Sequence, residues 1–110
     1  SRLMQPAAER LLARLAELTL QAPRIPVVNN IDVSVESDPA RIRDALYRQA
    51  FGPVRWVECV QAIKARGMGA VIECGPGKVL AGLTRRIDAE LLSGAVFDPA
   101  SLQETRTLLS

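Results

Sequence analysis

The sequence predicts an α/β protein with a mostly parallel sheet flanked by helices. Amphipathic helical patterns alternate with short apolar runs along the chain, and this order is typical of strand–helix–strand units. The composition agrees, because 48% of the 110 residues are hydrophobic and 24% are charged, which are ordinary proportions for a globular domain. The length suits one domain of about 100–150 residues.

Eight elements are predicted from these patterns. In chain order they are a helix over 6–20, a strand over 25–33, helices over 37–51 and 54–67, a strand over 68–74, a helix over 78–92, a strand over 94–97 and a helix over 98–110. The helices show apolar residues at spacings of three and four. The strands are short and rich in β-branched side chains. Three strands make a thin sheet with long edges, so the chain is expected to be part of a larger domain.

Proline, glycine and polar residues set the helix boundaries. Pro6 lies near the first turn of the first helix, and Pro39 follows an N-cap at Ser37 or Asp38, because proline is favoured at the first helical position. Gly67 is expected to end the third helix as its C-cap. The last helix again begins with an Asp-Pro pair.

Composition excludes several classes of function. The net charge of +2 and the single Trp, single Tyr and two Phe argue against a nucleic-acid-binding surface. The absence of His removes His-based zinc sites and the commonest general base from these residues, so no metal site is predicted. No apolar run approaches the roughly 20 residues that span a bilayer. The two cysteines form no metal-ligand pattern, and a reduced, cytoplasmic setting is expected.

The stretch VIECGPGKVL, residues 71–80, resembles a phosphate-binding loop but fails its tests. A Walker A loop needs a hydroxyl residue after Gly-Lys, where this chain has Val79, and a glycine at the position of Ile72. A dinucleotide fingerprint needs a glycine in place of Leu80. The Gly-Pro-Gly motif at 75–77 is therefore interpreted as a strand-to-helix turn, with Lys78 in the first turn of the helix that follows.

Three blocks together resemble one enzyme family. IPVVNNIDV, IRDALYRQAFGPVRWVECV and ECGPGKVLAGLTRRI are similar, in sequence and in order, to the C-terminal third of malonyl-CoA:acyl-carrier-protein transacylases. The resemblance covers roughly residues 1–88. It implies that residues 1–110 form the C-terminal part of an α/β-hydrolase-like large subdomain. The nucleophile elbow Gly-x-Ser-x-Gly, the catalytic His, the Arg that binds malonyl carboxylate and a ferredoxin-like subdomain are expected upstream, with the His immediately before Ser1.

The resemblance also implies an activity. Such enzymes transfer a malonyl group from malonyl-CoA to the phosphopantetheine thiol of acyl carrier protein through a malonyl-serine intermediate, in fatty-acid biosynthesis. They need no metal or redox cofactor. The implied partners are acyl carrier protein, malonyl-CoA and the remainder of the chain's own polypeptide, in a monomeric protein; residues 1–110 alone should be inactive. Two alternatives stay open, a trans-acting acyltransferase of polyketide synthesis and a non-catalytic α/β binding module.

One catalytic participant is carried over from the family, Gln49 of the Arg-Gln pair. The resemblance implies that its carbonyl, in the side chain or the main chain, accepts a hydrogen bond from the His ring. A His that acts as a base needs its second nitrogen anchored in this way. Without the resemblance, Gln49 would be interpreted as a solvated residue near a helix end.

Three cations are predicted to bind the carrier protein: Lys78, Arg85 and Arg86. Carrier proteins are acidic, and a basic patch beside the active-site mouth would steer them. The alternative is a solvated helix face whose arginines favour the helix C-terminus. Cys59 and Cys74 are interpreted as small apolar residues of the core.

Overall fold

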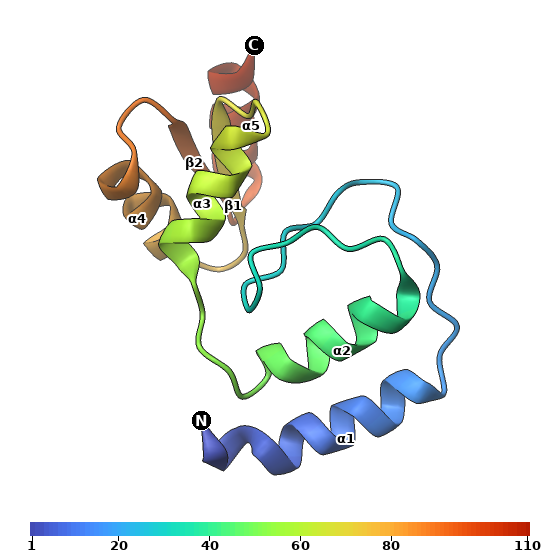
Figure 1. The fold of residues 1–110 in the computed structure, drawn as a ribbon. Helices are drawn as coiled ribbons and strands as arrows, with labels where there is room; N and C mark the ends of the chain where they lie inside the picture. The colour runs from blue at the N-terminus through green and yellow to red at the C-terminus, as the bar shows by residue number, and fades with distance from the viewer. The chain divides into compact units, whose positions relative to one another are not determined.

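The computed structural model describes residues 1–110, which divide into two compact units, Ser1–Ala62 and Ile63–Ser110 (Figure 1). The elements in chain order are η1 Arg2–Met4, α1 Gln5–Ala16, α2 Pro39–Gln49, α3 Trp56–Ala65, β1 Ala70–Cys74, α4 Val79–Ile87, β2 Leu92–Val96 and α5 Pro99–Leu109. The predicted class, parallel strands flanked by helices, is confirmed. Every predicted helix is present, although each is shorter than the sequence pattern suggested.

The first unit is built on helices α1 and α2, which pack side by side and run in opposite directions (Figure 1). Ala8 and Leu15 are buried on α1, and their spacing of seven places them on one helical face. Ala45 is buried on α2. A hydrogen bond from Gln5 Nε2 to Tyr47 Oη, 3.0 Å long, joins the two helices. The start of α2 is as predicted, with Asp38 as the N-cap residue and Pro39 next.

The predicted strand over 25–33 is wrong. The only β-pairing in this segment is a single antiparallel bridge between Val28 and Val35. A strand needs a neighbour to bond its backbone groups, and this segment meets only its own continuation. Ile25 and Val27 are 76% and 59% exposed, so the apolar run is not a buried strand here. The sheet therefore has two strands rather than three.

The second unit is a β–α–β–α arrangement. Strands β1 and β2 pair in parallel, in register from Ala70 opposite Leu92 to Cys74 opposite Val96. Both α4 and α5 contact β2, and α4 also contacts β1. Gly67, with φ of 93°, ends α3 as predicted.

Small side chains form the buried face of α4. The sequence pattern predicts one apolar side formed by Val79, Leu80, Leu83 and Ile87. Val79 and Leu80 are nevertheless 73% and 39% exposed, whereas Ala81 and Thr84 are 7% and 0% exposed. The Thr84 hydroxyl donates to the carbonyl of Leu80 at 2.9 Å, which satisfies it without another partner. Small buried residues let the helix lie close to the sheet.

A carboxylate from the preceding strand caps α4. Lys78 occupies the N-cap position and has no side-chain acceptor. Instead, Glu73 Oε1 accepts from the backbone N–H of Ala81 at 3.0 Å. A negative charge at this end also complements the helix dipole. Glu73 thus gives the Gly-Pro-Gly turn a structural anchor, and Gly75 adopts φ of 155° within that turn.

The last helix begins with a capping box. Asp98 Oδ1 accepts from the N–H of Ser101 at 2.7 Å, and Ser101 Oγ accepts from the N–H of Asp98 at 3.0 Å. Pro99 takes the first helical position. The Asp-Pro start of α5 is as the sequence predicted.

We expect acid to destabilise the fold, because three aspartates have lowered pKa values. Hydrogen bonds from Arg48 lower the pKa of Asp32, Lys64 lowers that of Asp88, and the N–H of Ser101 lowers that of Asp98. The unfolded chain then binds more protons below pH about 4, so stability is present above that pH and lost as the pH falls through the folded pKa values.

Urea titrations of the full-length protein at several pH values would measure this loss. The urea midpoint should fall between pH about 5 and 3, and Asp98→Asn should flatten the dependence. An unchanged midpoint over this range would contradict the assignment.

Candidate functional site

Gln49 is the last residue of α2, and its main-chain carbonyl accepts no hydrogen bond within the chain. The next donors along the chain bond to its neighbour, because both Phe51 and Gly52 donate to the carbonyl of Arg48, at 3.4 and 2.8 Å. The residue four positions after Gln49 is Pro53, which has no N–H to give. The Gln49 carbonyl therefore remains an acceptor for a donor from outside these residues.

The side chain of Gln49 is used differently. Its Oε1 accepts from the backbone N–H of Asn30 at 3.3 Å, and the carbonyl of Asn30 accepts from the N–H of Arg55 at 3.0 Å. The side-chain oxygen thus ties α2 to the preceding loop. Of the two acceptors that the sequence left open for Gln49, the main-chain carbonyl is the one without a partner.

The loop at 29–34 is held by the buried side chain of Asn29, which is 8% exposed. Its Oδ1 accepts from the N–H of Asp32 at 2.7 Å, and its Nδ2 donates to Ser34 Oγ at 3.1 Å. The carbonyl of Asn29 accepts from the N–H of Val33 at 3.1 Å. These bonds are those of an Asx-type turn, which asparagine favours.

An arginine joins this loop to α2. Arg48 Nη1 and Nη2 donate to the two carboxylate oxygens of Asp32 at 2.8 and 2.7 Å, and Nε donates to Asp44 at 2.8 Å. These bonds raise the pKa of Arg48 above its ordinary value and lower that of Asp32. A two-bonded guanidinium–carboxylate pair fixes orientation as well as distance.

Glycine is required where the loop crosses the end of α2. A Cβ atom added to Gly52 would lie 2.3 Å from Ile31 Cδ1 and 2.8 Å from the carbonyl oxygen of Arg48. Both distances are shorter than van der Waals contact. Gly52 therefore permits close approach between the loop and the end of α2, and Pro53 has no N–H to donate to the Gln49 carbonyl.

An apolar cavity of about 290 Å³ lies beside Gln49 in the first unit. Its walls are largely aliphatic. The polar residues that line it are Gln21, Asn29, Glu36 and Gln49. This volume is at the small end of the range for ligand pockets.

Val33 has φ of 57°, the left-handed region that β-branched residues rarely adopt. We expect Val33→Asn to stabilise the protein by about 1 kcal/mol, because asparagine tolerates this conformation. Urea unfolding of the full-length protein would measure the gain. A clear loss of stability would mean that packing of the Val33 side chain outweighs the backbone cost.

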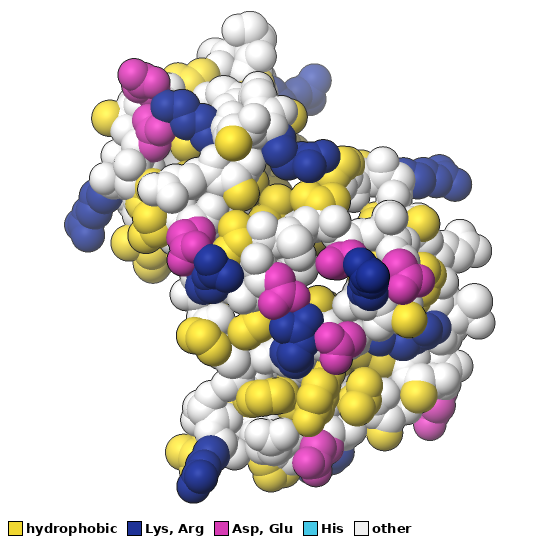
Figure 2. Space-filling view, in the orientation of Figure 1, with side chains coloured by type: hydrophobic (Ala, Val, Ile, Leu, Met, Phe, Trp, Pro, Cys, Tyr) yellow, Lys and Arg dark blue, Asp and Glu magenta, His cyan; other side chains and the backbone are white.

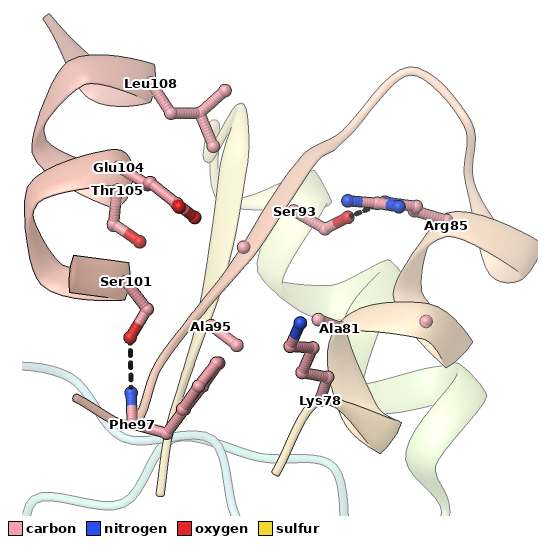
Figure 3. Close-up of a pocket in the computed structure, with 12 residues that line it drawn as sticks. Lys78, Ala81, Arg85, Ser93, Ala95, Phe97, Ser101, Glu104, Thr105 and Leu108 are labelled. Atoms are coloured by element: carbon pink, nitrogen blue, oxygen red, sulfur yellow. Dashed lines mark hydrogen bonds between the residues drawn. The ribbon is translucent and has the colours of Figure 1, made fainter.

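The predicted carrier-binding residues lie in the second unit. Lys78 and Arg85 line one cavity of about 470 Å³, shown in Figure 3, between α4 and α5 over β2. Lys78 Nζ lies 5.1 Å from the centroid of the Phe97 ring, and Arg85 Nε donates to Ser93 Oγ at 2.9 Å. Glu104 faces the cavity from α5.

Arg86 is exposed and does not line this cavity. None of the three predicted cations forms an ion pair within the chain. Each is therefore available to pair with an anionic group of another molecule. The structure thus brings Lys78 and Arg85 to one cavity and leaves Arg86 on the neighbouring surface. On the face drawn in Figure 2, Lys and Arg side chains lie among Asp and Glu side chains.

The prediction for the two cysteines is half wrong. Cys59 is buried at 3% exposure, and its Sγ lies 3.7 Å from the carbonyl oxygen of Asn29. Burial raises the pKa of this thiol. Cys74 is exposed at the end of β1.

Comparison with known proteins confirms the resemblance to acyltransferases of the malonyl-transferring class. No family model matches the chain. The malonyl CoA-acyl carrier protein transacylase of Salmonella typhimurium is 50% identical over 105 residues, 96% of this chain and 34% of that protein.

None of the helices is both long enough and apolar enough to cross a membrane.

Solved structures agree. The acyl-carrier-protein S-malonyltransferase of Burkholderia pseudomallei is 63% identical with a TM-score of 0.87, over 94% of this chain and 34% of that one. A malonyl-transacylase in complex with a type II PKS acyl-carrier protein is 48% identical with a TM-score of 0.85, over 92% and 33%. The chain is therefore similar, over nearly its whole length, to malonyl-CoA:acyl-carrier-protein transacylases. It spans about a third of the length of these relatives.

Proposed function

We propose that the full-length protein containing these residues transfers a malonyl group from malonyl-CoA to acyl carrier protein in fatty-acid biosynthesis. The observation that carries the proposal is the identity of 50% and 63%, over at least 94% of the chain, with proteins named for this activity. Residues 1–110 would be the C-terminal part of the large subdomain of such an enzyme.

The proposed reaction has two acyl-transfer steps. A serine hydroxyl, from a segment outside these residues, attacks the thioester carbonyl of malonyl-CoA while a His takes its proton. The C–S bond then breaks and CoA leaves with a proton, which forms a malonyl-serine ester. The thiol of the carrier's phosphopantetheine attacks this ester, its proton returns to the serine oxygen, and the malonyl thioester of the carrier is released. These steps need no metal or redox cofactor.

Within this chain, Gln49 is proposed to orient the His. Its main-chain carbonyl has no donor of its own and would accept the N–H of the imidazole, so that the other ring nitrogen faces the serine. A neutral acceptor adds no negative charge to a pocket that must also hold the malonate anion.

The acidic carrier protein is proposed to dock on the second unit. Arg86 and Arg85 would attract it, with Lys78 as a weaker contributor, because all three cations are unpaired within the chain and basic surfaces steer acidic partners. We further propose that the protein is cytoplasmic and monomeric.

Mass spectrometry of the full-length protein tests the proposal. Incubation with malonyl-CoA should yield a malonyl ester on one serine, and addition of holo acyl carrier protein should discharge it to malonyl-carrier. A protein that binds the carrier but forms no ester would be the non-catalytic module instead. Acetyl-CoA serves as the control substrate and should leave the protein unmodified.

A second candidate function is supply of malonyl groups to a polyketide carrier. The observation that favours it is the 48% identity to a transacylase solved with a type II PKS acyl-carrier protein. Transfer rates to the two kinds of carrier, measured with the same malonyl-enzyme, would discriminate. A kcat/KM for the polyketide carrier far above the kcat/KM for the fatty-acid carrier would favour this second function.

A further inference from the structure

We propose that the Asp32–Arg48 ion pair is a positioning element for the catalytic base, because it locks the loop at 29–34 to the end of α2 and thereby fixes the Gln49 carbonyl. This inference rests on the proposed function. Asp32 and Arg48 would not touch substrate; they act through the backbone of Gln49.

Hydrogen bonds hold the backbone both before and after Gln49. Before it, Arg48 is held by two parallel bonds to Asp32, of 2.8 and 2.7 Å. After it, Gly52 donates to the Arg48 carbonyl at 2.8 Å. The side chain of Gln49 itself accepts from Asn30 in the same loop at 3.3 Å. The Gln49 carbonyl belongs to the peptide whose N–H, that of Ala50, donates to the carbonyl of Tyr47 at 3.2 Å, so rotation of this carbonyl would break that bond as well.

The pair is poorly explained as a device for stability alone. The side chains of Arg48 and Asp32 are 35% and 40% exposed, and ion pairs this exposed contribute little to stability. Arg48 already has a second carboxylate, Asp44, one turn earlier on the same helix at 2.8 Å. The bond to Asp32 is the one that joins two segments of the chain, and the loop reaches it through the unfavourable φ of Val33.

Small displacements matter for such a carbonyl. Catalytic groups must be held within about 0.5 Å of the productive geometry, and a shift near 1 Å can lower a rate by about 100-fold. A residue that fixes the acceptor should therefore affect kcat much more than KM.

Asp32 and Asp44 form a matched pair of test variants. Both carboxylates bond the same guanidinium, and Asn replaces each with the same loss of charge. In the full-length protein, Asp32→Asn should lower kcat for malonyl transfer by about tenfold or more with KM for malonyl-CoA within about twofold. Asp44→Asn should leave both within about twofold. Arg48→Lys, which keeps the charge but not the two-bond geometry, should resemble Asp32→Asn.

A second measurement does not depend on activity. Amide hydrogen exchange at Asn30 and Gly52 should rise by about tenfold in Asp32→Asn and stay unchanged in Asp44→Asn. Equal effects of the two variants on kcat, or faster exchange throughout the chain in Asp32→Asn, would overturn the proposal. If the protein without substitutions transfers no malonyl group, the proposed function fails. The exchange data still decide whether the Asp32–Arg48 pair fixes the end of α2.

Discussion

Gly52→Ala is expected to destabilise the full-length protein by about 2 kcal/mol and to lower malonyl transfer at the same time. The added Cβ would lie 2.8 Å from the carbonyl oxygen of Arg48 and 2.3 Å from Ile31 Cδ1. The end of the Ile31 side chain can rotate away, but the carbonyl can move only with the end of α2, and Gln49 is the next residue. Urea unfolding and steady-state kinetics would measure the two effects.

Gly82→Ala is the matched control. A Cβ at Gly82 meets no atom within 4 Å, and Gly82 lies inside α4, where alanine is favoured over glycine by about 1 kcal/mol. We therefore expect Gly82→Ala to be neutral or stabilising. If Gly52→Ala gave the same result as Gly82→Ala, the close approach of the loop to α2 would be refuted.

Arg86→Glu is expected to lower kcat/KM for acyl carrier protein by about tenfold or more at low ionic strength, if the carrier docks as proposed. Arg86 is exposed and has no ion pair in the chain, so its reversal should leave the fold unchanged. Hydrolysis of malonyl-CoA in the absence of carrier should stay within about twofold, since that reaction needs no docking. The difference should shrink at high salt, because screening acts on exposed charges.

Arg106→Glu provides the control for charge alone. Arg106 is also exposed, on α5, and the change in net charge is the same. A loss of carrier kinetics equal to that of Arg86→Glu would indicate a general charge effect rather than a docking site. The double variant Arg85→Glu/Arg86→Glu should be more severe, although it also breaks the bond between Arg85 and Ser93.

Helix starts were predictable because their signals are local. Asp38-Pro39 and Asp98-Pro99 each begin a helix, and Gly67 ends one with positive φ. The segment at 25–33 was not predictable in this way, since a β-branched run becomes a strand only if another strand pairs with it. Its single bridge to Val35 shows that pairing, and not propensity, decides its structure.

The buried face of α4 shows a second limit. Periodicity of the large apolar residues favoured Val79 and Leu80, yet Ala81 and Thr84 are the buried ones. Close helix–sheet packing selects small side chains, which carry little weight in a hydrophobic pattern. A search for small residues spaced three or four apart would have found this face.

The residues of the candidate site also differ in whether a local sequence signal identifies them. Gln49 came from the resemblance, and Pro53, four residues later, was the available signal that its carbonyl would lack a donor. Asp44, one turn before Arg48, follows the local rule for helical ion pairs. Asp32 lies 16 residues away from Arg48 in sequence, and no local rule joins them, so the link between loop and helix becomes visible only in the fold.

The contrasting environments of the two thiols have a practical use. Cys74 is exposed beside the turn that leads into α4, whereas Cys59 is buried with a raised pKa, and thiolate is the reactive form. Within residues 1–110, a maleimide dye should therefore attach selectively at Cys74 without any engineered cysteine. A fluorophore there would report on arrival of a partner at the second unit by a change in its emission.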